Sequence, residues 1–307
     1  MIYFLKLIRY QNLMLIALMQ YLFKWMLIDV FFKESALLSW QYTLMVIATL
    51  CIAAAGNIIN DLQDVDADRI NKPKKVIIGT RISEKIGNWL YIGFTFAGVL
   101  LGFYVANASG RPGFAVIFVL ISGLLYYYSV SLKKVPVVGN LLVSLLVSFA
   151  VLLTGVFTIL PIASDTNRYL IQYIFKILLW YACFAFYINF LRELIKDVED
   201  IDGDHSAGVV SIPMVIGRKR TVRLLSMLTA LPCAALLFAV YEYLHTQPFL
   251  NVYILFGIMG PLLYVAFTSW DAKKRRQYRR ISILLKIIML LGVFSIIVIR
   301  FTLFNKL

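Results

Sequence analysis

Two acidic segments of this chain combine residue types and spacing that could do chemistry. The first, Asp61-Leu-Gln-Asp-Val-Asp-Ala-Asp68, follows one long apolar run, and the second, Asp197-Val-Glu-Asp-Ile-Asp-Gly-Asp204, follows another. Both segments have aspartate at the first, fourth, sixth and eighth positions. Acids that were merely solvated in loops would have no reason to repeat one spacing, so the pattern predicts two copies of one kind of site.

Helical periodicity indicates which of these carboxylates can act together. Residues three, four or seven apart lie on one face of a helix, whereas residues two apart do not. If both segments are helical, Asp66 and Asp202 therefore point away from the other aspartates. The converging sets are Asp61, Asp64 and Asp68 in the first segment and Asp197, Asp200 and Asp204 in the second.

Oxygen ligands of this kind favour Mg²⁺ over zinc or copper, and the chain has only two histidines. Carboxylates stacked on one helix face repel each other, and a divalent cation removes that cost. A calcium loop would need Gly at its sixth position and Glu at its twelfth, but Asp66 and Lys72, then Asp202 and Gly208, stand there. Because Mg²⁺ is commonly held by carboxylates plus substrate phosphates, we predict two facing Mg²⁺ sites that bind a diphosphate.

Catalytic and phosphate-binding roles follow from this arrangement. All six converging aspartates are predicted metal ligands. The predicted catalytic residues among them are Asp64, Asp68, Asp200 and Asp204. The basic residues positioned to neutralise the remaining phosphate charge are Arg69, Lys72, Lys75 and Lys196.

The elements that must position these residues are membrane helices. Hydrophobic residues make up 61% of the chain and charged residues 15%, whereas a soluble domain has roughly 45–50% and about 25%. A bilayer core of ~30 Å needs roughly 20 apolar residues per helix. Runs of that length are Tyr10–Phe31, Leu38–Ile58, Asn88–Ala106, Phe114–Leu132, Val138–Leu160, Tyr169–Phe190, Val222–Tyr241, Phe249–Trp270 and Ile281–Phe304. We predict an all-α integral membrane bundle of nine transmembrane helices, in a single domain over residues 1–307.

Loop charge predicts the orientation of this bundle. Most of the 30 Lys and Arg residues lie at the N-terminus and in the loops after the second, fourth, sixth and eighth runs, whereas the opposite loops hold only Lys33, Arg111 and Arg168. The basic side is normally cytoplasmic. We therefore predict a multi-pass protein of the cell (inner) membrane, surrounded by lipid, with its N-terminus and acidic segments cytoplasmic. The same distribution explains the net charge of +14 without a nucleic-acid partner.

The first acidic segment and its flanks resemble the UbiA superfamily of intramembrane prenyltransferases. The stretch from Asn60 to Asp68 matches the NDxxDxxxD signature, residues 69–73 resemble its DRxN(R/K)P continuation, and residues 200–204 resemble the second motif, DxxxD. Residues 9–12 resemble the RPxN opening with Tyr10 in place of proline. The segment from Tyr128 to Lys133, with Pro136, Gly139 and Asn140, is similar to the loop after the fourth helix, whereas Lys75-Val-Ile-Ile-Gly79 departs from the Arg-Pro-Leu-Pro-like run of many members.

The resemblance, which runs from about Arg9 to Gly217, implies Mg²⁺-dependent transfer from a prenyl diphosphate donor to a lipophilic acceptor. The metal would draw charge onto the leaving diphosphate, and an apolar tunnel would keep water from the carbocation-like centre. It further implies diphosphate binding by Asn60 and Lys133, and acceptor or prenyl binding by Asn12 and Tyr128. The run Tyr126-Tyr127-Tyr128 either lines the reaction centre through its ring faces or lies at the membrane interface.

The acceptor is indicated by the second acidic segment. Residues 192–204 are most similar to the RExxKDxEDxxGD segment of the digeranylgeranylglyceryl phosphate synthase branch, whose members O-alkylate a prenylated glycerol phosphate. C-prenylation of an aromatic quinone, tocopherol or chlorophyll-type precursor is the alternative within the class. Outside the prenyltransferase class, the alternative is a nine-helix transporter. A transporter would need ionisable groups near mid-span and broken helices in matched halves, but the acidic segments here come after the ends of the apolar runs.

Overall fold

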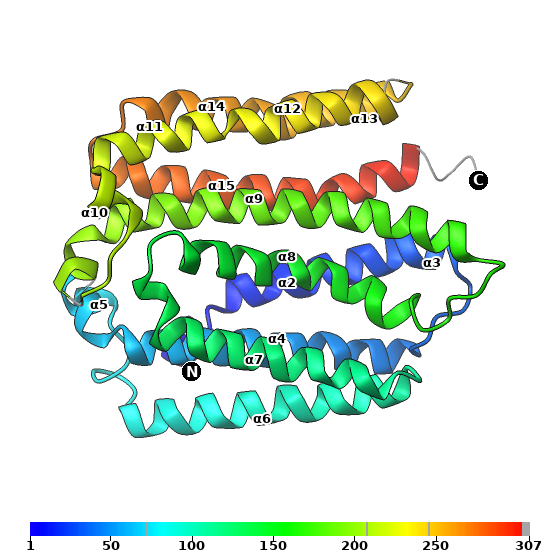
Figure 1. Ribbon diagram of the computed structural model, residues 1–307, viewed down its shortest axis with the longest axis horizontal. Coiled ribbons are helices and arrows are strands. Elements are labelled where there is room, and N and C mark those ends of the chain that lie inside the picture. Colours follow the sequence, from blue (N-terminus) through cyan, green and yellow to red (C-terminus); the bar gives the residue numbers. More distant parts are fainter. Residues whose placement is uncertain (72, 207, 245, 303–307) are drawn as a thin grey trace.

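The chain is a bundle of long helices that lie side by side (Figure 1). The computed structural model describes residues 1–71, 73–206, 208–244 and 246–302. Within this part of the chain, the extended structure is limited to one isolated bridge between Ile78 and Ile82. The predicted all-α fold is therefore confirmed.

Nine helical segments of the described residues are long and apolar enough to cross a membrane. In chain order they are α2 (Tyr10–Phe23) with η1 (Lys24–Ile28) and α3 (Asp29–Phe31); α4 (Ser39–Gln63); α6 (Glu84–Ala108); η3 (Pro112–Phe114) with α7 (Ala115–Val130); α8 (Val138–Thr158); α9 (Arg168–Ser206); α11 (Arg218–Leu228) with α12 (Ala230–Ala239) and η5 (Val240–Leu244); α13 (Pro248–Val252) with η6 (Tyr253–Met259) and α14 (Gly260–Trp270); and α15 (Arg275–Thr302). Short elements connect them: α1 (Ile2–Leu7), α5 (Val65–Asn71), η2 (Pro73–Lys75), η4 (Leu132–Lys134) and α10 (Ile212–Ile216). The nine predicted spans are confirmed, although the predicted last residue, Phe304, lies outside the described residues.

The sixth span is much longer than its apolar run. The run ends at Phe190, but α9 continues through the second acidic segment to Ser206. Its 39 residues correspond to roughly 58 Å of helix, against ~30 Å for the hydrocarbon core. The second acidic segment is therefore helical, as predicted, and α9 carries it beyond the apolar part of the bundle.

The first acidic segment is not one continuous helix, and the prediction is wrong at one residue. The backbone of Asp64 has φ −100° and ψ 10°, which ends α4 at Gln63. A new helix, α5, begins at Val65, and the Asp68 N–H donates to the Asp64 carbonyl at 2.8 Å. The bend turns α5 against the end of α9, so the two acidic segments meet at one end of the bundle (Figure 1).

Helix packing explains which faces are apolar. α4 packs on α6, and α8 and α15 both pack on α9, with buried aliphatic and aromatic side chains between them. On α7, apolar side chains such as Val116 and Leu120 are instead more than half exposed. An outward apolar surface of this extent suits contact with lipid tails, as the membrane prediction requires.

Candidate active site

A cavity of about 1120 Å³ lies among α2, α4, α5, α7, α8, α9 and α15. Its wall includes all six aspartates that the helical spacing predicted to converge: Asp61, Asp64, Asp68, Asp197, Asp200 and Asp204. The other two aspartates of these segments face away from it, as predicted. The side chain of Asp66 is 91% exposed and pairs with Arg69 at 3.3 Å, and that of Asp202 is 75% exposed and pairs with Arg218 at 2.7 Å.

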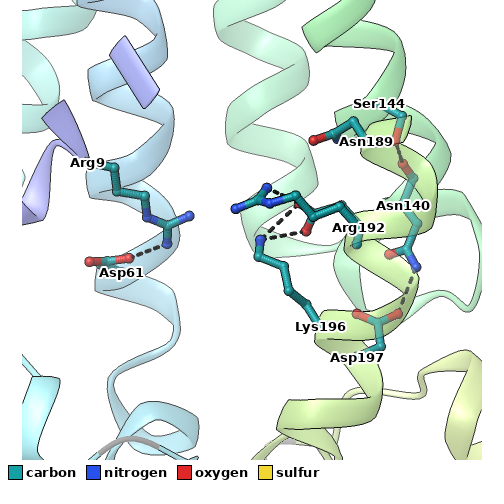
Figure 2. Close-up of polar contacts among 9 residues, drawn as sticks. Arg9, Asp61, Asn140, Ser144, Asn189, Arg192, Lys196 and Asp197 are labelled. Carbon is teal, nitrogen blue, oxygen red and sulfur yellow. Dashed lines mark hydrogen bonds and ion pairs between the residues drawn. The ribbon is translucent and has the colours of Figure 1, made fainter. Parts of the chain in front are cut away.

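Arg9 forms one side of the site with Asp61. The Arg9 Nη2 lies 2.8 Å from Asp61 Oδ1 (Figure 2). Burial disfavours the charged guanidinium, but the charge and hydrogen bond of Asp61, together with the charges of Glu193 and Asp68, raise the pKa of Arg9 above its ordinary value. Arg9 has φ 53° and ψ 51°, in the left-handed region. A residue before proline is restricted to extended backbone, so this conformation is compatible with Tyr10 and not with the proline of the RPxN motif.

The connection between α7 and α8, together with the first turn of α8, contacts both acidic segments. Lys133 forms an ion pair with Asp64, and Asn140 Nδ2 donates to Asp197 Oδ2 at 2.7 Å. Between them, Val137 has φ 70° and ψ −46°, and the Val138 N–H donates to the Pro136 carbonyl at 2.8 Å. A tight turn of this kind is rare for a β-branched residue, and such strain is typically retained where it serves a site. Here the turn lies between Lys133 of η4 and Asn140 in the first turn of α8, and both side chains line the same cavity.

A cationic cluster on α9 forms the opposite side. Glu193 accepts from Arg192 at 3.1 Å and from the Lys196 ammonium at 2.9 Å. Figure 2 shows the Arg192 guanidinium and the Lys196 ammonium extending from α9 toward the Arg9–Asp61 pair. Lys196 was predicted from its place in the sequence, but Arg192 and Glu193 were not. Arg192 precedes Lys196, and Glu193 precedes Asp197, by about one helical turn. This spacing would have indicated both residues if the helix had been expected to continue past Phe190.

Asn71 joins the two acidic segments. Its Nδ2 donates to the Asp200 carbonyl at 2.8 Å, and its Oδ1 accepts from the Gly203 N–H at 2.9 Å. From α15, Arg275 donates to the Asn71 carbonyl at 2.7 Å, and its Nη2 lies 3.6 Å from Asp200 Oδ1. A Cβ on Gly203 would lie 2.4 Å from Asn71 Nδ2 and 2.5 Å from the Ala67 carbonyl oxygen, so only glycine permits this approach. Three helices are thereby fixed around the second set of carboxylates.

The remaining predicted site residues divide into two groups. The cavity is lined by Asn12, Asn60, Lys75, Tyr128, Lys133 and Lys196. Arg69 is not among the lining residues, and its pairing with Asp66 turns it outward, contrary to its predicted role. Lys72 lies outside the described residues. Of the tyrosine run only Tyr128 lines the cavity, whereas Tyr126 and Tyr127 are about half exposed.

The donor atoms of this site fit a hard divalent cation. No group of three or more acidic, His or Cys side chains in the described ranges is close enough to hold a metal alone. Mg²⁺ does not require such a cage, because it keeps waters and takes substrate phosphate oxygens beside one or two carboxylates. The Oδ1 of Asn60, on the cavity wall, is buried without a hydrogen-bond partner, which adds one oxygen donor to the carboxylates. The set is therefore compatible with Mg²⁺.

The cavity becomes apolar away from the carboxylates. The apolar lining comes from α2, α4, α7 and α8: Ile16, Ile52, Ala53, Phe118, Ile121, Leu125, Leu146, Val147, Ala150 and Leu153. An amphiphile with a phosphorylated head and a hydrocarbon tail matches this division of the wall. The arrangement can therefore bind a diphosphate at one end and hold an apolar chain, away from water, at the other.

Comparison with known proteins places this geometry in context. The model of the UbiA prenyltransferase family matches residues 24–295. A digeranylgeranylglyceryl phosphate synthase of Korarchaeum cryptofilum is 30% identical over 249 residues, which cover 80% of this chain and 81% of that protein. A solved structure concerning digeranylgeranylglyceryl phosphate synthase in membranes superposes with a TM-score of 0.62, at 21% identity and with 96% of each chain covered. A UbiA homologue from Archaeoglobus fulgidus bound to GPP and Mg²⁺ gives 0.59 at 17% identity, covering 96% of this chain and 99% of that one.

Proposed function

The chain belongs to the UbiA prenyltransferase family, and from this premise we propose that it transfers a prenyl group from a prenyl diphosphate to the hydroxyl of a prenylated glycerol phosphate. One observation carries the proposal: two sets of three aspartates line one cavity whose opposite end is apolar. The relative from Korarchaeum cryptofilum bears the name of a digeranylgeranylglyceryl phosphate synthase, which supports this acceptor.

The proposed roles follow the position of each residue in the cavity. Asp61, Asp64 and Asp68 would supply carboxylate ligands to one Mg²⁺, and Asp197, Asp200 and Asp204 to another, with water and phosphate oxygens as the remaining ligands. Mg²⁺ bound there would supply Lewis-acid neutralisation of the diphosphate. Arg9, Lys133 and Lys196 surround the same space and stabilise the negative charge that develops on the departing group.

Bond changes in the proposed reaction involve one carbon of the donor. The bond between its allylic carbon and the bridging oxygen breaks, and the electron pair leaves with the diphosphate. The acceptor hydroxyl oxygen then bonds to this carbon, and the hydroxyl proton passes to the released diphosphate. The apolar wall, together with the ring of Tyr128, excludes water that would otherwise capture the carbon.

Product analysis tests the proposal. Purified protein supplied with Mg²⁺ and geranylgeranyl diphosphate is offered a glycerol phosphate that carries one prenyl chain, or a set of aromatic acceptors. We expect mass spectrometry to find the glycerol phosphate with a second prenyl chain, with one diphosphate released per product. Chelation of Mg²⁺ should stop both product formation and diphosphate release. Prenylated aromatic products alone would instead assign C-prenylation, and the absence of any diphosphate release would overturn the proposal.

We also propose that the cavity opens toward the cytoplasm, in the cell membrane. The basis is loop charge: among the connecting loops, the end of the bundle opposite the acidic segments holds only Lys33, Arg111 and Arg168, whereas most Lys and Arg lie in the loops at the acidic end. The end that carries the acidic segments would therefore face the cytoplasm.

Cysteine labelling tests this orientation. In a background lacking Cys51, Cys183 and Cys233, single cysteines replace the exposed Thr166, before α9, and the exposed Lys219, at the start of α11. In intact cells, a membrane-impermeant maleimide is expected to label Thr166→Cys and not Lys219→Cys, and inverted vesicles should give the reverse. Labelling of Lys219→Cys from outside intact cells would show that the orientation is wrong.

A further inference from the structure

Three cations of α15 lie along the face that borders the cavity. Arg275, Arg279 and Lys286 are spaced by four and then seven residues, which places them on one side of the helix. Arg275 contacts Asp200, whereas Arg279 and Lys286 line the cavity. The Lys286 ammonium donates to Asn12 Oδ1 at 2.7 Å.

Lys286 differs from Lys24 and Lys176, two other lysines within membrane-length helices. Lys24 pairs with the carboxylate of Asp29 at 2.7 Å, and the Lys176 ammonium lies 4.8 Å from the centre of the Tyr243 ring. The hydrogen-bond partner that the structure gives Lys286 is a neutral amide. A cation in a membrane span is costly and commonly marks a ligand or ion site.

Arg192 is a second cation, and its hydrogen-bond donors are only partly paired. Its Nη1 contacts Glu193, but that carboxylate also accepts from Lys196 through both of its oxygens. The Arg192 Nε is buried without a hydrogen-bond partner. Arg192, Lys196 and Lys286 all line the cavity at the corner formed by α2, α9 and α15, where Glu193 pairs with the first two of them.

This corner lies deeper in the bundle than Asp200, one of the carboxylates proposed to hold the donor. On α9, Arg192 precedes Asp200 by eight residues, or about 12 Å of helix, and on α15 Lys286 follows Arg275 by eleven residues, or about 16 Å. Because Arg275 contacts Asp200, the two cations share a similar depth. Both therefore lie further into the bundle than Asp200, and Arg192 also faces the Arg9–Asp61 pair at the border of the diphosphate site (Figure 2).

We infer that Arg192 and Lys286 form a second anion subsite, which binds the phosphate monoester of the acceptor. This inference rests on the proposed prenyl transfer to a glycerol phosphate. An Arg fork and a Lys ammonium suit the oxygens of a phosphate, and Asn12 holds the lysine at the cavity wall. The subsite selects an acceptor with an anionic head and places its neighbouring hydroxyl toward the donor.

Steady-state kinetics of Lys286→Gln test this subsite. We expect the KM for the phosphorylated acceptor to rise roughly 10- to 100-fold, because a hydrogen bond between charged groups is lost. The KM for the prenyl diphosphate should stay within about twofold, and Lys286→Arg, which keeps the charge, should restore most of the acceptor affinity. Arg280→Gln is the matched control, because Arg280 is an exposed cation of the same helix outside the cavity.

Two further comparisons separate the possible failures. With the dephosphorylated alcohol as acceptor, the wild type and Lys286→Gln should have equal KM values, because the phosphate is no longer present to be bound. If Lys286→Gln does not fold, Arg192→Gln provides the same test, because it removes the other cation of the subsite, on α9. An unchanged KM for the phosphorylated acceptor in both variants would overturn the subsite while leaving prenyl transfer intact. A wild-type protein that releases no diphosphate with any acceptor would overturn the proposed function, and the subsite with it.

Discussion

Asp64→Asn and Asp200→Asn are each expected to lower kcat for prenyl transfer by roughly 100- to 1000-fold or more. Each substitution removes one charged ligand from a different set of carboxylates, and both sets line the same cavity. The fold should persist, because Asn has nearly the same size as Asp and both side chains border a polar space. Turnover of detergent-purified protein and its elution as a single species on size exclusion are the measurements.

Matched controls exist inside the same two segments. Asp66→Asn and Asp202→Asn remove acids that face outward and form exposed ion pairs, so each should lower turnover less than about tenfold. Near-normal turnover by Asp64→Asn or Asp200→Asn would contradict the two-site arrangement. A deep loss in Asp66→Asn or Asp202→Asn would show instead that these acids reach the substrate.

Gly203→Ala is expected to lower turnover by about 100-fold without a change at any proposed ligand. The added Cβ would lie 2.4 Å from Asn71 Nδ2 and 2.5 Å from the Ala67 carbonyl oxygen, so α5 and α9 must separate. Asn71 then loses its bonds to the backbone of the second acidic segment. A shift of ~1 Å in a positioned group can cost about 100-fold in rate.

Gly93→Ala is the control for this prediction, because a Cβ at this position of α6 meets no atom within 4 Å. Turnover and the midpoint of thermal unfolding are measured for both variants. We expect Gly93→Ala to behave as the wild type, since alanine is the better helix former. Full activity in Gly203→Ala would mean that the junction between α5 and α9 adapts without moving the carboxylates.

The sequence was sufficient to predict the spans and the orientation of the acidic side chains. Apolar runs of membrane length have few alternatives to helices, because backbone groups in lipid must pair within the segment. The exposed positions of Asp66 and Asp202 follow from the helical period of 3.6 residues. The bend at Asp64 does not change this result, because the chain is helical on both sides of it, in α4 and in α5. These features depend on local geometry, which a single sequence contains.

Features that depend on tertiary contacts could not be predicted. The bend at Asp64 accompanies the packing of α5 on α9, and neither segment shows this partnership by itself. Arg69 was predicted to face the phosphates because it lies near Asp68, but its place on α5 turns it toward Asp66. Lys286 lies 218 residues after the end of the first acidic segment and 82 after the end of the second, and it has no local signal that connects it to them. Its proximity to Asn12 arises from the approach of α15 to α2.

The change from a polar to an apolar wall along the cavity also determines how a substrate travels between the bilayer and the protein. A prenyl diphosphate in a leaflet already has its charged head in the headgroup layer and its tail among the acyl chains. If the acidic end of the cavity lies at that layer, the lipid can enter by lateral diffusion without turning over or passing through water. Extraction would otherwise cost about 0.8 kcal/mol for each methylene transferred to water. A doubly prenylated product also has a charged head and apolar tails, so it can return to the leaflet along the same route.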